Sequence, residues 1–198
     1  MPFESTVARR NIAGFERRAV DGPDLVGAAV ALIVVDDPEP SFVLTLRAPK
    51  LRAHAGQWAL PGGKMDRGET PVVTARREVS EEIGIDLSPG AVMGILDDYE
   101  TRSGYVITPV VFHLGTDFEP VVATDEIAEI YTIPLSSIDV EPTFSRIEQS
   151  SRPVIKLPML GKFIHAPTAA ILYQFCQVAI HGQHTRVHEF EQPLFAWK

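Results

Sequence analysis

Cysteine is nearly absent from this chain of 198 residues, which contains only Cys176. A single cysteine cannot form an internal disulfide, so disulfides do not hold the fold together, and this usage fits a reducing compartment. Cys176 lies in an apolar helical pattern with Leu172 and Ala179. For that reason we expect a buried thiol without a catalytic role.

Long apolar segments are also missing. The longest run, residues 27–35, has about half the length that a helix needs to cross a membrane. The first residues, MPFESTVARRN, contain no apolar stretch of signal-peptide length. These absences predict a soluble, cytoplasmic protein that does not insert into membranes.

Basic residues are outnumbered by acidic ones. The chain has 18 Lys and Arg against 26 Asp and Glu, which gives a formal net charge of −8. This balance argues against a protein that binds nucleic acid or anionic membranes. It remains compatible with a small phosphorylated substrate, because metal ions and local arginines determine the electric field within a site.

The length is sufficient for one domain with a sizeable core. No internal repeat, low-complexity tract or flexible linker divides the sequence. We expect an α/β fold in which helices flank a mixed sheet. Its parts are a helical extension at 1–26, the main domain at 27–181 and a tail at 182–198. The tail carries two phenylalanines and Trp197, and we expect it to pack on its own core or on a partner subunit, as in a homodimer.

Apolar periodicity and turn residues indicate the main elements. Strands are predicted at 27–35, 41–46, 92–99 and 106–114, and helices at 5–19 and 167–181. Residues 141–158 contain three prolines and little periodicity, and we expect them to form a long loop that lids the site.

A further helix is predicted at 71–83. Thr70 can cap free amide groups, Pro71 at the first helical position needs no donor, and Gly84 is a suitable stop. The apolar stripe of this helix consists of Ala75, Val79 and Ile83. Three glutamates then project together from a neighbouring face: Glu78, Glu81 and Glu82.

This acidic face is unfavourable without a counter-ion. Glu78 and Glu82 are like charges at i,i+4 spacing, which costs roughly 0.2–0.5 kcal/mol. All three glutamates lie in the half of the helix where the macrodipole favours cations. A bound divalent metal relieves both penalties, and carboxylates suit Mg²⁺ or Mn²⁺. A solvated amphipathic helix is the alternative interpretation.

The spacing around this helix resembles a known family motif. Gly63 is followed by five residues, Glu69, seven residues and the segment REVSEEIGI at 77–85, which is similar to the Nudix box at every defined position. The resemblance implies a Nudix hydrolase with an α/β/α sandwich at 27–181. Such an enzyme cleaves a nucleoside diphosphate linked to another moiety, by attack of water on the diphosphate.

The same resemblance implies a role for each charged residue of the box. The implied metal ligands are Gly63, Glu78, Glu81 and Glu82. One of the glutamates also acts on water, and Arg77 with Glu69 holds the ligands in place. Glu126 is a candidate second group that activates water, because Nudix enzymes often carry a base on a loop after the box. A solvated or helix-starting Glu126 is the alternative.

A narrower resemblance precedes the box. Residues 43–63, VLTLRAPKLRAHAGQWALPGG, are similar to the motif found there in the coenzyme A diphosphatase branch. Leu60 departs from that motif, which usually has phenylalanine; the change keeps an apolar side chain but loses a ring. Arginine forks match phosphate oxygens, and His and Gln add directed hydrogen bonds. The candidate substrate-binding residues are therefore Arg47, Arg52, His54 and Gln57.

The leading hypothesis is a metal-dependent diphosphatase. Its substrate is coenzyme A or acyl-coenzyme A, and its products are 3′-phosphoadenosine 5′-phosphate and 4′-phosphopantetheine. One alternative is the same chemistry on ADP-ribose, NADH or an oxidised nucleotide. The other is a Nudix module that senses a nucleotide without turnover.

Overall fold

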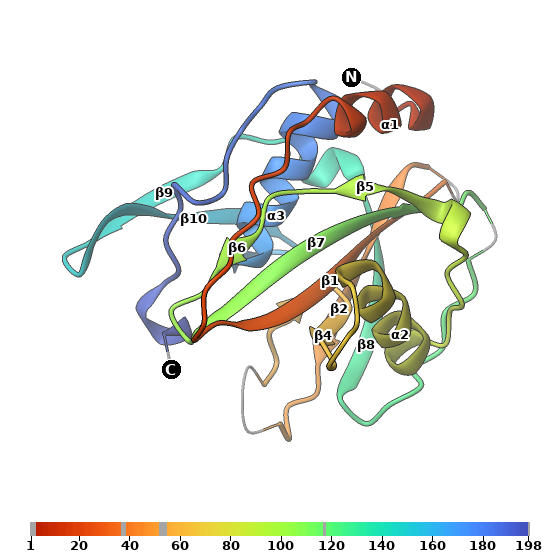
Figure 1. Cartoon of the computed structure of the whole chain (residues 1–198), viewed down its shortest axis with the longest axis horizontal. Coiled ribbons are helices and arrows are strands. Elements are labelled where there is room, and N and C mark those ends of the chain that lie inside the picture. Colours follow the sequence, from red (N-terminus) through yellow and green to blue (C-terminus); the bar gives the residue numbers. More distant parts are fainter. Residues whose placement is uncertain (1–2, 37–38, 52–54, 117, 198) are drawn as a thin grey trace.

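The computed structural model describes residues 3–36, 39–51, 55–116 and 118–197. In this part of the chain an eight-stranded sheet lies beside a three-stranded one (Figure 1). The strands of the large sheet are β1 (Val26–Val35), β2 (Ser41–Arg47), β3 (Trp58–Ala59), β4 (Gly62–Lys64), β5 (Val92–Ile95), β6 (Tyr99–Glu100), β7 (Tyr105–His113) and β8 (Ile127–Pro134). The α-helices are α1 (Ser5–Ala13), α2 (Pro71–Ile83) and α3 (Thr168–Phe175).

The large sheet is mixed, as predicted. β1 and β7 run parallel, from the pair Val26↔Tyr105 onward, whereas the other pairings are antiparallel. The other edge of β1 is shared, because β2 pairs with its end at Val34 and β4 pairs with its beginning at Ala29. β2 therefore diverges from β1, and the short strand β4 fills the gap beside it.

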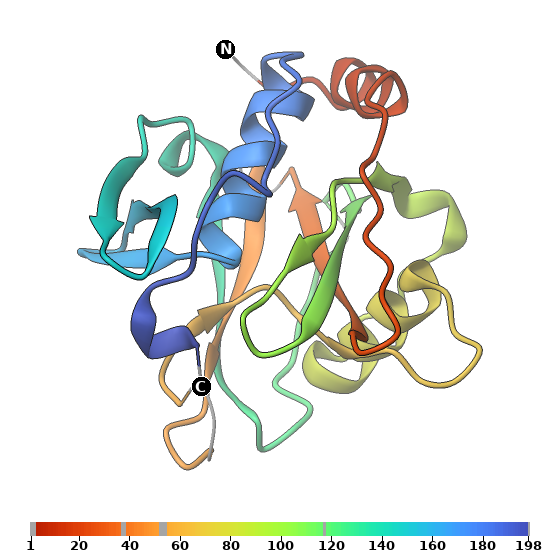
Figure 2. The same ribbon diagram turned by 60° about the vertical axis from the view of Figure 1, so that its left-hand side comes forward.

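Strand β1 separates two hydrophobic cores. Alternate residues of a strand point to opposite faces of a sheet. Ala29, Ala31, Ile33 and Val35 accordingly join the core beneath α2, whereas Leu32 and Val34 join the core beneath α1 and α3. Figure 2 shows α2 and α3 on opposite sides of the large sheet. The prediction of a strand buried on both faces, with helices flanking a mixed sheet, is confirmed.

Helix α2 begins and ends where its local sequence predicts. The hydroxyl of Thr70 accepts a hydrogen bond from the backbone N–H of Val73 at 3.4 Å, and Pro71 occupies the first turn. Gly84 ends the helix with φ of 69°, a left-handed conformation that suits glycine. The apolar stripe of the helix is fully buried and consists of Ala75, Val79 and Ile83.

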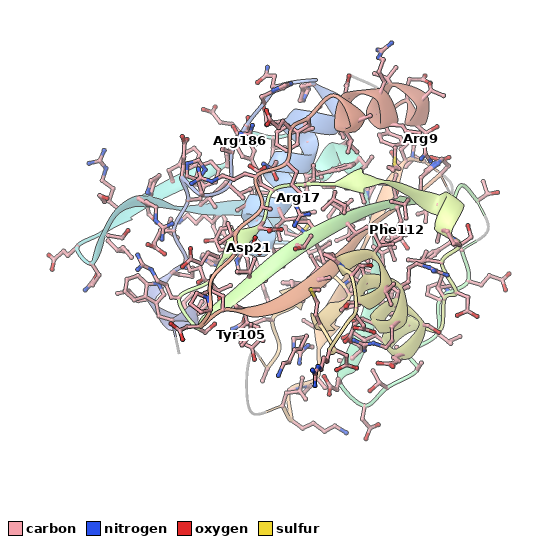
Figure 3. All side chains as sticks on the ribbon, in the orientation of Figure 1. Arg9, Arg17, Asp21, Tyr105, Phe112 and Arg186 are labelled. Atoms are coloured by element: carbon pink, nitrogen blue, oxygen red, sulfur yellow. The ribbon has the colours of Figure 1, made fainter. Side chains whose placement is uncertain are left out.

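The N-terminal helix is shorter than predicted. Helix α1 ends at Ala13, and residues 14–25 are not helical. The guanidinium of Arg17 donates to Asp98 at 2.7 Å, and the backbone N–H of Arg18 donates to Asp97 at 2.7 Å. Figure 3 shows Arg17 on the segment that crosses the sheet. These long-range contacts hold the segment extended, so the local helical pattern does not decide its conformation.

The predicted loop at 141–158 is wrong. This region forms β9 (Thr143–Ile147) and β10 (Ser150–Met159), and β11 (Lys162–His165) completes the small sheet. Pro153 is tolerated in β10 because it lies at an irregularity of the β9–β10 pairing. The carbonyl of Pro153 accepts a hydrogen bond from Glu191 N–H in the tail.

Two further predictions need adjustment. The strand expected at 92–99 is divided into β5 and β6, with Gly94 at a register shift of the β5–β7 pairing. The helix expected at 167–181 is present as α3, which continues into the π-helical turn η3 (Cys176–Ile180). Three short 3-10 turns are η1 (Pro89–Ala91), η2 (Leu135–Ser137) and η4 (Leu194–Ala196). None of the helices within the described ranges has the length and apolarity needed to cross a lipid bilayer.

The C-terminal tail lies against the core of its own chain. The hydroxyl of Tyr99 donates to the carbonyl of Phe190 at 3.2 Å, and the amide of Gln174 donates to the carbonyl of Thr185 at 2.8 Å. Glu191 is buried and accepts hydrogen bonds from two arginines, Arg102 and Arg152. The tail thus ends beside the large sheet, near the turn between β6 and β7 (Figure 1).

Candidate active site

The site begins where β4 passes α2. The backbone N–H of Gly62 donates to Oε2 of Glu82 at 3.1 Å. A Cβ on Gly63 would lie 2.4 Å from Oε1 of Glu78, and one on Gly62 would lie 2.3 Å from the carbonyl oxygen of Ala29. Neither position has room for a side chain. Glycine at both therefore allows strand, helix and acidic groups to approach one another.

Glu69 and Arg77 form a two-point ion pair. Nε of Arg77 lies 2.9 Å from Oε1 of Glu69, and Nη2 lies 3.1 Å from Oε2. The hydroxyl of Thr74 donates to the same carboxylate at 2.6 Å, and the backbone N–H of Asp66 donates at 3.0 Å. The hydrogen bonds from Arg77, then from Thr74 and Asp66, lower the pKa of Glu69 to about 2. Glu69 is a fixed anion that orients Arg77.

Arg77 extends this pair to the glutamates of the helix. Its Nη1 lies 2.7 Å from Oε1 of Glu78 and 3.1 Å from Oε2 of Glu81, and its Nη2 donates to the carbonyl of Lys64 at 3.1 Å. The hydrogen bond with Glu69 is the main reason why the pKa of Arg77 is raised. One guanidinium therefore connects the loop, strand β4 and the acidic face of α2.

The three glutamates of α2 differ in environment. Glu82 is only 7% exposed, and its burial raises its pKa to about 7, although the Gly62 N–H opposes the shift. Burial also raises the pKa of Glu78, against the hydrogen bond from Arg77. The side chain of Glu81 is 59% exposed. A buried carboxylate next to a half-buried one is costly to ionise unless a cation is near.

A divalent metal fits this donor set in its chemistry. Carboxylate and backbone oxygens are the ligands that Mg²⁺ and Mn²⁺ prefer. Such an ion would offset the burial that raises the pKa of Glu78 and Glu82. Within the described residues the ligand oxygens of the three glutamates do not all lie within 4.8 Å of one another. The side chain of Glu81 is exposed, and its Oε2 lies 3.1 Å from Nη1 of Arg77.

A pocket of about 710 Å³ opens beside the acidic face. Its lining includes the whole of β4, residues 62–64. The same strand contacts Glu78, Glu82 and Arg77 of α2. This volume lies in the range of pockets that bind small molecules, about 300–1,000 Å³. The β4 backbone is therefore shared by the acidic cluster and the pocket.

Arg47 and Gln57 of the predicted substrate-binding residues line this pocket. Nε of Arg47 is buried and has no hydrogen-bond partner among the described residues, whereas its Nη2 lies 3.3 Å from Oε2 of Glu126. A buried guanidinium N–H without an acceptor is costly, and a phosphate oxygen would satisfy it. Arg52 and His54 lie outside the described residues.

Glu126 lies at the edge of the same site. It precedes β8, and its ion pair with Arg47 brings it toward the acidic cluster. Its charge contributes to raising the pKa of Glu82, which lies on a different element. The fold therefore brings Glu126 near the glutamates of α2. It also joins Glu126 to Arg47, which lies 79 positions earlier in the chain.

Comparison with known proteins identifies the family. Residues 26–156 match the family model described as the NUDIX domain. The chain belongs to the NUDIX domain family.

Relatives of this NUDIX protein include bacterial proteins named as an uncharacterized Nudix hydrolase NudL. The one from Pectobacterium atrosepticum is 35% identical over 159 residues, which cover 74% of this chain and 79% of that protein. The one from Escherichia coli O7:K1 is 39% identical over 110 residues, which cover 55% of this chain and 57% of that protein. The matched segment thus spans little more than half the length of the E. coli relative.

A solved structure has the same type of fold. The MutT/nudix family protein from Enterococcus faecalis shares 18% identity with this chain and has a TM-score of 0.51. The likeness covers 74% of this chain and 52% of that chain.

Much of the pocket wall lies beyond the NUDIX match. Residues 162–168 and the tail residues Gln192, Phe195 and Ala196 line the pocket. None of these was predicted as a site residue. The only sequence signal was the aromatic tail, because no local motif shows that β11 and the tail fold back onto the sheet.

A separate cluster of the NUDIX protein joins the π-helical turn η3 to the segment that follows η2. Potential ligand atoms of Asp139, Cys176 and His181 lie within 4.8 Å of one another. Oδ1 of Asp139 lies 2.7 Å from Nε2 of His181 and 3.5 Å from Sγ of Cys176. Burial, followed by the charge of Asp139, raises the pKa of Cys176 to about 12. Cys176 is thus a buried, protonated thiol, in agreement with the sequence-based expectation.

Proposed function

We propose that this NUDIX protein is a metal-dependent diphosphatase of coenzyme A or acyl-coenzyme A. The products are 3′-phosphoadenosine 5′-phosphate and 4′-phosphopantetheine. The observation that carries the proposal is the β4 backbone, which contacts the acidic cluster on one side and lines the pocket on the other. A diphosphate in the pocket would therefore lie between Arg47 and the glutamates of α2.

Different residues of the chain have different roles in the proposed reaction. Arg47 offers its unsatisfied Nε–H to a phosphate oxygen and positions the diphosphate. Glu82 has a pKa of about 7 without a cation, because it is buried, and it can take a proton from the attacking water. Glu69 and Arg77 orient the neighbouring glutamates. When bound, a divalent metal ion neutralises phosphate oxygens and lowers the pKa of water.

The bond that breaks is a P–O bond of the diphosphate bridge. Water supplies the oxygen that joins one phosphorus, and the bridging oxygen leaves with the other phosphate. We propose Glu78, Glu81 and Glu82, with Gly63, as the metal ligands. Glu126 is the candidate for a second group that accepts a proton, because it lies close enough for its charge to raise the pKa of Glu82.

The choice of coenzyme A is supported by the segment at 43–63. This segment forms β2, β3 and β4, and several of its residues line the pocket, including Arg47 and Gln57. Its likeness to the motif of the coenzyme A diphosphatase branch favours coenzyme A over ADP-ribose, NADH or an oxidised nucleotide. The relatives named NudL are themselves uncharacterized and do not distinguish these substrates.

A substrate panel tests the proposal. Purified protein is incubated with coenzyme A, acetyl-coenzyme A, ADP-ribose, NADH or 8-oxo-dGTP in the presence of Mg²⁺ or Mn²⁺, and the products are separated by chromatography. We expect coenzyme A or its acyl derivative to have the highest kcat/KM. Faster cleavage of ADP-ribose or NADH would assign the protein to the alternative substrate class. Tight nucleotide binding without any cleavage would identify a sensor module.

We also propose a cytoplasmic location and a homodimer. The single cysteine, Cys176, is a free thiol, which agrees with a reducing compartment. Phe144 and Leu160 of the small sheet region are large apolar residues that are exposed in the single chain. Light scattering coupled to size-exclusion chromatography measures the number of subunits.

A further inference from the structure

Part of the pocket wall is aromatic. Five side chains with aromatic rings line it and come from three strands and the tail: Trp58, Tyr105, Phe163, His165 and Phe195. We call Phe163, His165 and Phe195 the aromatic wall. All three lie beyond the NUDIX match, which ends at residue 156.

Rings of this wall remain open to solvent. Phe195 is 58% exposed, Phe163 is 48% exposed and the nearby Tyr105 is 39% exposed. Figure 3 shows Tyr105 at the end of the sheet where the tail arrives. Exposed apolar groups gathered in a concave site mark a place where a ligand is bound. Phe195 and Tyr105 therefore offer exposed ring surface to an occupant of the pocket, whereas the ammonium of Lys156 lies over the ring of Phe163, 4.8 Å from its centroid.

Contacts with one another and with the rest of the chain hold the rings of the wall in place. The ring of His165 meets the ring of Phe195 edge-on, with centroids 5.3 Å apart. Burial, followed by the charge of Lys156, lowers the pKa of His165, so its imidazole is neutral at pH 7. The tail is held by Glu191, which pairs with Arg102 and Arg152 a few residues before Phe195.

Two polar side chains near the wall, those of Gln192 and Thr101, already make hydrogen bonds within the chain. Oε1 of Gln192 accepts a hydrogen bond from Arg102 N–H at 2.7 Å. The hydroxyl of Thr101 donates to the Tyr105 carbonyl at 3.1 Å and accepts from the Tyr105 N–H at 2.9 Å. A flexible chain with two amides, such as pantetheine, would need hydrogen-bond partners here. A flat base needs mainly ring faces, and base–aromatic stacking supplies them.

A cation lies next to the wall. Lys162 lines the pocket and immediately precedes Phe163 on β11. It can pair with a phosphate on the sugar of a bound nucleoside.

We propose that the aromatic wall binds the adenine base of the substrate by stacking, with Phe195 as a specificity-determining residue. The proposal rests on the proposed diphosphatase function, because it assigns the nucleoside half of that substrate to this part of the pocket. The 4′-phosphopantetheine half then extends from the other end of the diphosphate, outside the wall.

Binding of the two halves of coenzyme A tests this without turnover. Isothermal titration measures the Kd of adenosine 3′,5′-bisphosphate and of 4′-phosphopantetheine for the full chain and for Phe195→Ala. We expect the Kd of the bisphosphate to rise about tenfold in the variant, with no change for 4′-phosphopantetheine. A rise confined to 4′-phosphopantetheine, or no change for either ligand, would overturn the proposal.

Leu194→Ala is the matched control. Leu194 is 43% exposed and adjacent to Phe195 in η4, but it does not line the pocket. Its substitution should leave both Kd values unchanged, and an equal rise in Leu194→Ala would show that the tail acts only by its fold. Phe195→Tyr keeps a ring and should retain tight binding, whereas Phe195→Leu should not. Equal binding by Phe195→Leu and the native chain would contradict stacking.

Failure of the two proposals gives different results. A native chain that binds the bisphosphate through Phe195 but cleaves no coenzyme A lacks the proposed activity and keeps the base site. A chain that cleaves coenzyme A with the same KM in Phe195→Ala keeps the activity and lacks the base site. The steady-state KM and kcat of the two chains therefore separate the outcomes.

Discussion

The backbone N–H of Gly62 donates to Oε2 of Glu82 at 3.1 Å and joins residues 20 positions apart. This bond orients a carboxylate that is almost completely buried between β4 and α2. Gly62 also lines the pocket, so the contact places the carboxylate of Glu82 next to the pocket wall.

Glutamine at Glu81 or Glu82 should abolish most of the turnover. The amide keeps the size of the side chain but removes the negative charge and the proton-accepting oxygen. We expect kcat to fall by about 100-fold or more in at least one variant, while circular dichroism shows a folded protein. Glu148→Gln, on an exposed turn of the small sheet, should keep native activity. Near-normal turnover of both active-site variants would remove the proposed mechanism.

Metal-free protein should lose stability as the pH rises. Burial raises the pKa of Glu82 from 4.5 to about 7, so the folded state holds a proton that the unfolded state releases between these values. Folding then becomes less favourable from pH 4.5 to pH 7, by at most about 3 kcal/mol. Urea unfolding at pH 5 and pH 8, with and without Mg²⁺, measures the effect.

Two outcomes identify Glu82 as the source of this loss. Mg²⁺ should restore stability at pH 8, and Glu82→Gln should remove the loss that depends on pH. A native chain and a Glu82→Gln variant with the same pH dependence would show that another group is responsible. Asp125→Asn, an exposed change in the pair with Lys50, is the control for added amides.

A methyl group on Gly63 should displace Glu78. The added Cβ would lie 2.4 Å from Oε1 of Glu78, a distance that requires the carboxylate to move. We expect Gly63→Ala to lower stability by about 1–3 kcal/mol and to raise the Mg²⁺ concentration needed for half-maximal activity. Gly90→Ala is the control, since its nearest neighbour is Oγ of Ser88 at 3.8 Å. An unchanged Mg²⁺ requirement in Gly63→Ala would argue against Glu78 as a ligand.

Acid should release the C-terminal tail. Burial acts to raise the pKa of Glu191, but hydrogen bonds from Arg102, Ser150 and Arg152 outweigh it and hold the pKa at about 2. The pairing is therefore fully present above the ordinary pKa of 4.5 and is lost as the pH falls toward 2. Trp197 packs on Arg102, with the guanidinium 4.7 Å from the ring centroid, so its fluorescence reports the release.

Glu191→Gln should reproduce this release at neutral pH. The side chains of Arg102 and Arg152 are 41% and 37% exposed, so water can solvate them when they lose the anion. We therefore expect the loss of these charged hydrogen bonds to cost about 1–3 kcal/mol. Asp125→Asn, whose carboxylate is exposed, should change stability by less than about 0.5 kcal/mol. Native stability of Glu191→Gln in urea unfolding would mean that the tail is held by other contacts.

Arg47→Lys should weaken substrate binding. Lysine keeps the charge but loses the planar fork, including the buried Nε–H that has no partner among the described residues. We expect KM to rise about tenfold with a smaller change in kcat. Lys50→Met, at an exposed position of the following loop, is the control. Equal KM values for Arg47→Lys and the native chain would remove Arg47 from the diphosphate site.

Local signals predicted much of the fold. The bounds of α2 follow from Thr70, Pro71 and Gly84, which satisfy or terminate a helix through their immediate neighbours. Strand β1 follows from a continuous β-branched run that suits a strand buried on both faces. The prediction of a helix at 14–19 failed because Arg17 and Arg18 bind aspartates that are distant in the chain. Such contacts do not appear in the apolar periodicity of the local sequence.

The small sheet shows the same limit. Pro153 and Pro158 made residues 141–158 resemble a loop, yet β10 accommodates both beside β9 and β11. The effect of a proline depends on whether its missing N–H is needed by a neighbouring strand. That neighbour is known only when the chain has folded.

The sequence by itself determined the acidic helix, its caps and the spacing of Glu69, Arg77 and the glutamates, since these depend on neighbours within one or two turns. Only the tertiary structure decided that Glu82 is buried against Gly62 and that β11 and the tail form the pocket wall. Burial and ring contacts arise where surfaces distant in the chain meet. Which surfaces meet depends on the packing free energy of the whole domain, which no short segment encodes.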